Sequence, residues 1–486
     1  MFATVRPTRR QLLKALAALG GLALASCAPA APTAAPTAAP KKEEPKPQPT
    51  EAKAAATPKE VRYFSWWPLF ISGVFPQIEK DFKDKFPNVT IKIEEVPYGE
   101  ALTKYTTTLS AGTSADVLFH MNFMSQYFTK GLILDLTPRF EKDGFVYERD
   151  FYQGLGIDKW AGKIYGFPHL FETCLILYNK TMVKQAWGKD LWEAFPDGNW
   201  DISDMITIGK ACAKGTGDKM EQWGAFIPYS NYYYGMEVLP WTMGDSIFDI
   251  QKMQYNFSTP VVQEVSNMLL DGVKKDRWII SDDDQSEINK AASTSYAFFA
   301  GKVAFHLRMS PDVGSSITVI GDKFEWDAFF LPNSKDKKAV TRAGGHGNNI
   351  YAKTKVPDEA YEFCKFLGTT PGQMPQAKAR ILVPVFRKDP ALRQAWLTGN
   401  PKHDSVIFGV LEDRGGYGDH MRFNNEDELL RMFTSEVQKL YALPHAEAKN
   451  SINGVMKQLE TDMNKIVDYG SELPFQGMQF PFKPPK

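Results

Sequence analysis

The sequence contains few cysteines and histidines, and none of them falls in a known catalytic or metal-binding spacing. Its 4 cysteines include no CxxC pair, and its 7 histidines form no HExxH motif. Zinc sites and redox-active thiol pairs usually depend on such spacings. The Gly-x-Ser-x-Gly turn of many serine hydrolases is missing as well. We therefore expect no metal and no cofactor, and no motif indicates catalysis.

Excess charge and long apolar runs are also missing. The chain carries 57 basic and 57 acidic side chains, so bulk electrostatics gives no argument for nucleic-acid binding. Beyond the first residues, no apolar run reaches the roughly 20 residues of a membrane-spanning helix. The most acidic stretch, 281–287, resembles a calcium loop but lacks the glycine and the terminal glutamate of that motif. We predict a solvated acidic loop there.

The first residues combine two arginines, a short apolar run and a cysteine. Arg9 and Arg10 precede an apolar run over 12–25, which is too short to cross a bilayer comfortably. The order Thr-Arg-Arg-Gln-Leu-Leu-Lys resembles a twin-arginine export signal, and Leu-Ala-Ser-Cys resembles the lipobox of bacterial lipoproteins. We predict that 1–26 is a signal peptide and that Cys27 is lipidated. The alternative is an ordinary signal peptide with an accidental cysteine.

A second segment, 27–58, consists mainly of Pro, Ala, Thr, Lys and Glu and has no aromatic side chain. Such a chain cannot bury enough apolar surface to offset the entropy of ordering it, so we predict a disordered tether. Together with the lipid, it would hold an exported body at the outer face of the cytoplasmic membrane, in the periplasm or at the cell surface. That body is too long for one hydrophobic core, which predicts two domains or more.

Three cysteines remain in the body, at Cys174, Cys212 and Cys364. An odd number cannot pair completely within one chain. Buried free thiols are therefore the favoured interpretation, and a single disulfide is the alternative.

The N-terminal part of the body alternates strand and helix patterns. Strand patterns cover 60–68, 89–96 and 116–119, and apolar residues recur at helical spacing over 75–86 and 102–109. Strands joined by helices form parallel sheets. The sequence therefore predicts an α/β fold.

Polar and aromatic side chains follow two of these strands, where ligands bind in open α/β sheets. Trp66 and Trp67 come after the first strand, and His120 and Asn122 come after the third. If the two tryptophans are extended, they point to opposite faces, so one should face a ligand and the other the core. A purely structural role is the alternative for His120.

Several segments resemble, in order, those of the extracellular solute-binding proteins of bacterial ABC importers, the group that includes maltose-binding protein. The similar segments are FPQIEKDFKDKFPNVTIKIEEVP, TTLSAGTSADVLF, GLILDLTP, GKIYGFPHLFETCLILYNKTMV, NWDISDMITIGKAC, FFAGKVAFHLRMS and AGGHGNNIYAKTKVPDEAYEFCKFL. None is specific alone, but the ordered series is. The resemblance implies a sugar-binding lipoprotein that is not an enzyme.

The resemblance also implies a two-lobed periplasmic-binding-protein fold of type II, hinge-linked, with the ligand cleft between the lobes. Lobe 1 would comprise 59–169 plus 345–370, and lobe 2 would comprise 170–344 plus 371–486. The C-terminal part shows amphipathic helical patterns that would pack mostly on lobe 2. We expect a monomer that binds a small molecule and a membrane permease.

Further ligand candidates lie at the predicted crossings between lobes. Glu172 interrupts an apolar run and could accept hydrogen bonds from sugar hydroxyls; capping a backbone turn at the hinge is its alternative role. Arg308 follows a predicted strand, and an ion pair with Asp312 is its competing role. Gly345 and His346 lie in the loop of the return crossing, where glycine lets backbone approach a ligand.

Aromatic residues make up 13% of the chain and cluster in the stretch PYSNYYYGMEVLPWTMGD. The apolar faces of sugars pack on aromatic rings, so we choose Tyr229, Tyr232 and Trp241 as stacking platforms. At least one tyrosine in this stretch should instead belong to the core.

Two other functions stay open beside capture of an intact sugar. A secreted glycoside hydrolase, or another carbohydrate-active enzyme, would need a pair of facing carboxylates, and none is marked by a motif. A lipid-anchored interaction protein would expose a large hydrophobic patch outside any cleft.

Overall fold

The computed structural model describes residues 57–66, 73–120, 124–152, 158–217, 219–249, 252–334, 339–412, 417–418 and 423–468. The predicted signal peptide, Cys27 and nearly all of the predicted tether lie outside these residues, as do Trp67 and Asn122. None of the helices in the described ranges is long and apolar enough to span a bilayer.

The chain begins its sheet with the predicted strand–helix–strand units. The first three strands are β1 (Lys59–Ser65), β2 (Val89–Glu95) and β3 (Val117–Phe119), connected by α2 (Phe75–Lys85) and α3 (Tyr98–Ala111). Strand β1 lies between β2 and β3 and pairs with both in parallel. Helix α2 buries Phe75, Ile78 and Phe82, the residues whose spacing predicted it. The α/β prediction for this part is confirmed.

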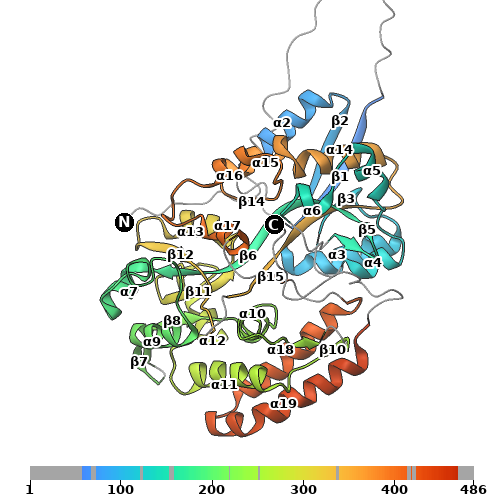
Figure 1. Ribbon diagram of the computed structural model, residues 1–486. Coiled ribbons are helices and arrows are strands. Elements are labelled where there is room, and N and C mark those ends of the chain that lie inside the picture. The colour runs from blue at the N-terminus through green and yellow to red at the C-terminus, as the bar shows by residue number, and fades with distance from the viewer. Residues whose placement is uncertain are drawn as a thin grey trace, which may run out of the picture. The chain divides into compact units, whose positions relative to one another are not determined.

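Two long antiparallel strands, β6 (Gly166–Asn179) and β13 (Thr341–Ile350), form the centre of the sheet, and every residue in both is buried. The sheet order is β2-β1-β3-β13-β6-β11-β8-β7 (Figure 1). Strand β6 pairs with β13 and with β14 (Val383–Pro384) up to Thr173. From Cys174 onward it pairs with β11 (Val303–Met309), and nearer its end also with β12 (Trp326–Phe329). Strand β6 therefore pairs with one set of strands along its first half and with another set along its second half.

At one edge the sheet ends with β8 (Lys219–Phe226) and β7 (Lys214–Thr216). The helices in this part of the fold include α9 (Ile202–Cys212), α10 (Gly235–Thr242), α11 (Pro260–Lys274), α18 (Glu426–Ala442) and α19 (His445–Ile466). Helix α19 packs against both α18 and α11 (Figure 1). The amphipathic helices predicted in the C-terminal part are confirmed, and α18 buries Leu429, Phe433, Val437 and Leu440.

The shorter elements complete the described chain. The helices are α4 (Ser125–Thr129), α5 (Thr137–Asp143), α6 (Tyr147–Asp150), α7 (Lys180–Trp187), α8 (Leu191–Ala194), α12 (Asp282–Ala292), α13 (Asp312–Ile320), α14 (Pro357–Gly368), α15 (Thr370–Lys378), α16 (Pro390–Trp396) and α17 (Val406–Glu412). The strands are β4 (Lys159–Trp160), β5 (Lys163–Ile164), β9 (Phe248–Asp249), β10 (Gln254–Tyr255) and β15 (Tyr417–Gly418).

The prediction of an acidic loop over 281–287 is wrong, because most of this stretch forms the first turns of α12. Ser281 caps the helix by accepting a hydrogen bond from the backbone N–H of Asp284 at 3.0 Å. Three aspartates in the first turn complement the positive end of the helix dipole. The acidic run therefore starts a helix.

The three cysteines of the body are buried and free, which confirms the prediction of free thiols. Burial raises the pKa of the Cys174 thiol to about 12. At neutral pH this thiol is protonated and is a poor nucleophile.

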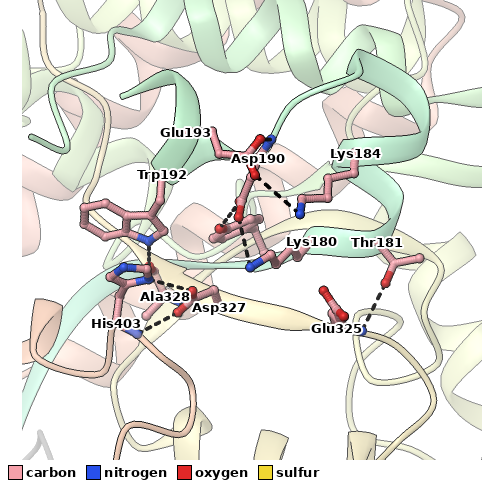
Figure 2. A network of polar contacts seen from close by, with 11 residues as sticks. Lys180, Thr181, Lys184, Asp190, Trp192, Glu193, Glu325, Asp327, Ala328 and His403 are labelled. Carbon is pink, nitrogen blue, oxygen red and sulfur yellow. Dashed lines mark hydrogen bonds and ion pairs between the residues drawn. The ribbon is translucent and has the colours of Figure 1, made fainter. Parts of the chain in front are cut away.

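A polar network connects β12 to the segment that carries His403 (Figure 2). The Asp327 carboxylate is buried and accepts hydrogen bonds from the backbone N–H of His403 at 3.0 Å and of Ala328 at 2.9 Å. The His403 ring lies 2.7 Å from Asp327 through Nδ1 and stacks on Trp192, with ring centroids 4.2 Å apart. This network fixes the chain that follows α16 against β12.

A buried histidine on β6 should make the stability of the protein depend on pH. Burial lowers the pKa of His169 to about 4, and its Nε2 lies 3.2 Å from the side-chain oxygen of Gln376. Between pH 6.5 and 4 the unfolded chain takes up a proton at this position and the folded chain does not. The free energy of unfolding should therefore fall with falling pH, by about 2 kcal/mol from pH 7 to 5.

Urea unfolding of the wild type and of His169→Gln at pH 7 and pH 5 checks this expectation. The variant should lose about 2 kcal/mol less than the wild type on acidification. An equal loss in both proteins would show that His169 does not couple folding to protonation.

Candidate ligand-binding site

The structure brings together five of the predicted ligand residues where β1, β3, β6 and β13 meet. Trp66 follows β1 and His120 follows β3, while Glu172 lies within β6 and Gly345 and His346 lie within β13. Because β13 lies between β3 and β6, residues that follow the parallel strands come beside residues of the central pair.

Trp66 is half-buried at this position. Its indole N–H donates to the carbonyl oxygen of His120 at 3.2 Å. Its ring stands perpendicular to that of His346, with centroids 5.2 Å apart, and edge-on to Phe119 at 4.9 Å. Both the polar tip and the ring of Trp66 are therefore held by neighbours.

His120 has a partner that sequence reasoning missed. Its side chain is 1% exposed and its Nδ1 lies 2.9 Å from a carboxylate oxygen of Asp158, which is itself fully buried. The two residues come from separate segments, and nothing in the local pattern around Asp158 marks it as a partner of His120.

Glu172 forms the charged centre of the site. Its carboxylate lies 3.7 Å from the guanidinium of Arg342 and 3.7 Å from Nε2 of His346. Glu172 and Arg342 are 8% and 3% exposed, respectively. Glu172 lies inside a continuous strand opposite Gly344, and its contact with a ligand stays a prediction. Sequence reasoning missed Arg342, although it lies three positions before Gly345 in the same stretch.

Arg342 connects the site to α10 and α18. Its guanidinium lies 5.7 Å from the centre of the Tyr233 ring. The Tyr233 hydroxyl in turn donates to the buried carboxylate of Glu426 at the start of α18. A chain of contacts thus connects β6 and β13 to the aromatic stretch that precedes α10.

Arg308 makes the ion pair that was its competing role. Its Nε donates to Asp312 at 3.1 Å and its Nη2 to the Tyr296 hydroxyl at 2.5 Å. Burial by itself would raise the pKa of Asp312, but Arg308 and His306 hold that pKa below its usual value. The Arg308 guanidinium also lies 4.7 Å and 4.8 Å from the ring centres of Tyr234 and Tyr296. A contact of Arg308 with a ligand stays a prediction.

The three chosen stacking platforms are buried in the apolar core. Tyr229 stacks on Tyr441 with ring centroids 4.1 Å apart. Tyr232 packs edge-on against Phe433 at 5.3 Å, and Trp241 is 4% exposed. In this conformation, neighbours of the same core cluster cover these side chains, so their role in stacking stays a prediction. Half-buried Tyr234 and Tyr296 are the more accessible rings nearby.

Within the described ranges, no group of three or more His, Cys, Asp and Glu side chains is arranged to hold a metal ion. What the site does contain is buried charge of both signs beside half-buried aromatic rings. Such groups can hydrogen-bond a polar molecule and pack on its apolar faces.

Known proteins similar to this chain are solute-binding proteins. A family model described as "bacterial extracellular solute-binding protein" matches residues 77–403. A Brucella abortus (strain 2308) protein, whose name marks it only as a binding protein, is 28% identical over 178 residues. A Brucella suis biovar 1 protein matches equally well. These matches cover 34% of this chain and only 40% of the length of each relative.

Solved structures show the same fold over most of the chain. The Listeria monocytogenes ABC substrate-binding protein Lmo0181, in complex with cycloalternan, has a TM-score of 0.69 at 19% identity, covering 83% of this chain and 99% of that one. The GacH receptor of Streptomyces glaucescens, solved unliganded and with acarbose, has a TM-score of 0.66 at 16% identity and the same coverage. UgpB of Mycobacterium tuberculosis, in complex with glycerophosphocholine, has a TM-score of 0.67 at 18% identity, covering 85% and 99%.

These likenesses confirm the type II periplasmic-binding-protein fold. The family match spans more than half of the 486 residues and includes Glu172, Arg342 and His346. The chain therefore belongs to the family of bacterial extracellular solute-binding proteins.

Proposed function

We propose that the protein captures a sugar or oligosaccharide outside the cytoplasmic membrane and delivers it intact to the permease of an ABC importer. The observation that carries this proposal is the buried cluster of Glu172, Arg342 and His346 beside the Trp66 ring. Carboxylate and guanidinium groups bridge sugar hydroxyls, and an indole face packs on the C–H face of a sugar ring. Carbohydrate complexes of similar solved proteins support the same ligand class.

Hinge closure is the proposed means of capture. The proposed lobes are 59–169 plus 345–370 and 170–344 plus 371–486. The change of β6 partners between Thr173 and Cys174 supports a crossing at this strand. A ligand that binds the closed form better than the open form shifts the population toward closure. The permease would recognise that closed form.

The membrane anchor belongs to the same proposal. Members of an extracellular family are exported, and this chain is exported with them. Lipidation of Cys27 and a tether over 27–58 would keep a monomeric receptor close to its permease. The lipobox-like order that ends at Cys27 supports this part.

The two alternative functions receive less support. The family consists of solute-binding proteins, not enzymes, so the hydrolase alternative is set aside. An interaction protein would need a broad exposed hydrophobic patch. In the described part of the chain, the large hydrophobic side chain that stands out as exposed is Val146, at 44%.

A thermal-shift screen tests the proposed function. The protein without residues 1–26, with Cys27→Ser, is heated with maltotriose, mannotriose, acarbose and, as a non-sugar arm, glycerophosphocholine. A ligand present at 100 times its dissociation constant should raise the free energy of unfolding by about 2.7 kcal/mol. Glu172→Gln should reduce that shift. The proposed ligand class would be overturned if glycerophosphocholine alone raised the melting temperature, or if none of the carbohydrates raised it.

A further inference from the structure

Asp158 is a fully buried carboxylate beside the candidate site. Burying a polar or charged group is costly unless a polar partner lies beside it, and Nδ1 of His120 lies 2.9 Å from one oxygen of Asp158. None of the sequence patterns predicted this pair. Because burying the Asp158 carboxylate costs folding free energy, we looked for a role of the pair in the site.

Two glycines of the central strands make room for this carboxylate. A Cβ atom on Gly166 would come within 2.2 Å of one Asp158 oxygen, and a Cβ atom on Gly347 within 2.1 Å of the other. Gly166 opens β6 and Gly347 lies in β13. Asp158 is thus seated against both strands that form the centre of the sheet.

The residue that Asp158 pairs with holds the ligand candidate Trp66. The backbone N–H of His120 donates to the carbonyl oxygen of Gly347 at 2.9 Å. The carbonyl oxygen of His120 accepts the indole N–H of Trp66 at 3.2 Å. The contacts therefore run in one line from Asp158 through His120 to the polar tip of the indole.

We propose that Asp158 is a positioning residue, which acts through His120 to fix the orientation of the Trp66 ring for ligand stacking. The inference rests on the proposed function for its purpose, but its geometry can be tested without a ligand. A binding ring that is held in advance loses less conformational entropy when the ligand binds. Asp158 itself does not contact the ligand.

Fluorine NMR of the protein labelled with 5-fluorotryptophan tests the geometry directly. The Trp66 resonance is assigned by its loss in Trp66→Phe. Asp158→Asn, which keeps the size of the side chain and removes its charge, should shift and broaden the Trp66 resonance while the other tryptophan resonances stay in place. In a His120→Gln background, the same substitution should have no further effect on Trp66, because the connection is already broken.

A matched control is Asp150→Asn. Asp150 is also a buried aspartate, 1% exposed, and its ion pair is with Arg149 at 2.6 Å. This variant should leave the Trp66 resonance unchanged. An unchanged Trp66 resonance in Asp158→Asn, or an equal disturbance of all tryptophan resonances, would overturn the inference.

A binding measurement separates this inference from the proposed function. With a carbohydrate that shifts the wild-type melting temperature in the screen, Asp158→Asn should raise the dissociation constant about tenfold, the low end for losing an outer positioning contact. Carbohydrate binding that is unaffected by Asp158→Asn would contradict the positioning role. Failure of every carbohydrate to bind would count against the proposed function, and the fluorine spectra would still decide on Asp158.

Discussion

Replacing Trp66 with alanine is expected to weaken carbohydrate binding by about 30-fold or more, the loss typical of a central aromatic contact. The half-buried ring lies beside the Glu172 cluster through His346, with ring centroids 5.2 Å apart. Alanine removes the stacking surface but leaves the charged groups in place. Isothermal titration of the wild type and the variant with the carbohydrate identified by thermal shift measures the change.

Trp192→Ala is the matched control for this substitution. Trp192 is also half-buried and its indole N–H also donates to a backbone carbonyl, that of Ala328, at 3.0 Å (Figure 2). Its removal should lower the melting temperature and leave the dissociation constant unchanged, because its ring stacks on His403 and not on residues of the site. If the two variants lose binding equally, Trp66 has no special role in the site.

Replacing Arg342 with methionine should lower the free energy of unfolding by about 3–5 kcal/mol, which is the usual cost of removing one member of a buried ion pair. Glu172, at 8% exposure, would lose the guanidinium 3.7 Å away. Urea unfolding at pH 7 measures the loss. Adding Glu172→Gln to the variant should recover part of it, because a buried amide costs less than a buried carboxylate.

Arg431→Met serves as the control for the loss of a guanidinium. The side chain of Arg431 is 68% exposed and pairs with Asp427 on the same helix at 2.7 Å. Its removal should change the free energy of unfolding by about 0.5 kcal/mol or less, because exposed ion pairs contribute little. A comparably small change in Arg342→Met would show that Glu172 does not depend on Arg342.

Much of the N-terminal fold could be predicted because its signals are local. The apolar spacing of Phe75, Ile78 and Phe82 defines one face of α2, and the alternation in 89–95 defines the two faces of β2. The acidic stretch at 281–287 misled the prediction because the capping role of Ser281 was overlooked. Charge composition alone did not distinguish a helix start from a loop.

The aromatic stretch shows where composition stops being informative. Adjacent tyrosines have the same chemistry, yet Tyr232 and Tyr233 are buried while Tyr234 is half-buried. Which ring faces the core depends on the direction in which the chain enters α10 and on which of the rings α18 packs against. Residue type predicted a set of rings but could not rank its members.

The sequence alone predicted an export signal and established the alternation of strands and helices and the resemblance to solute-binding proteins, since each depends on residues near one another in the chain. The pairs that build the site emerged only on folding. His120, after β3, meets Asp158, which lies just before β4. Glu172 meets Arg342 through the antiparallel register of β6 and β13, in which Gly344 lies opposite Glu172. A shift of one residue in that register would turn every side chain to the opposite face, and no local pattern specifies it.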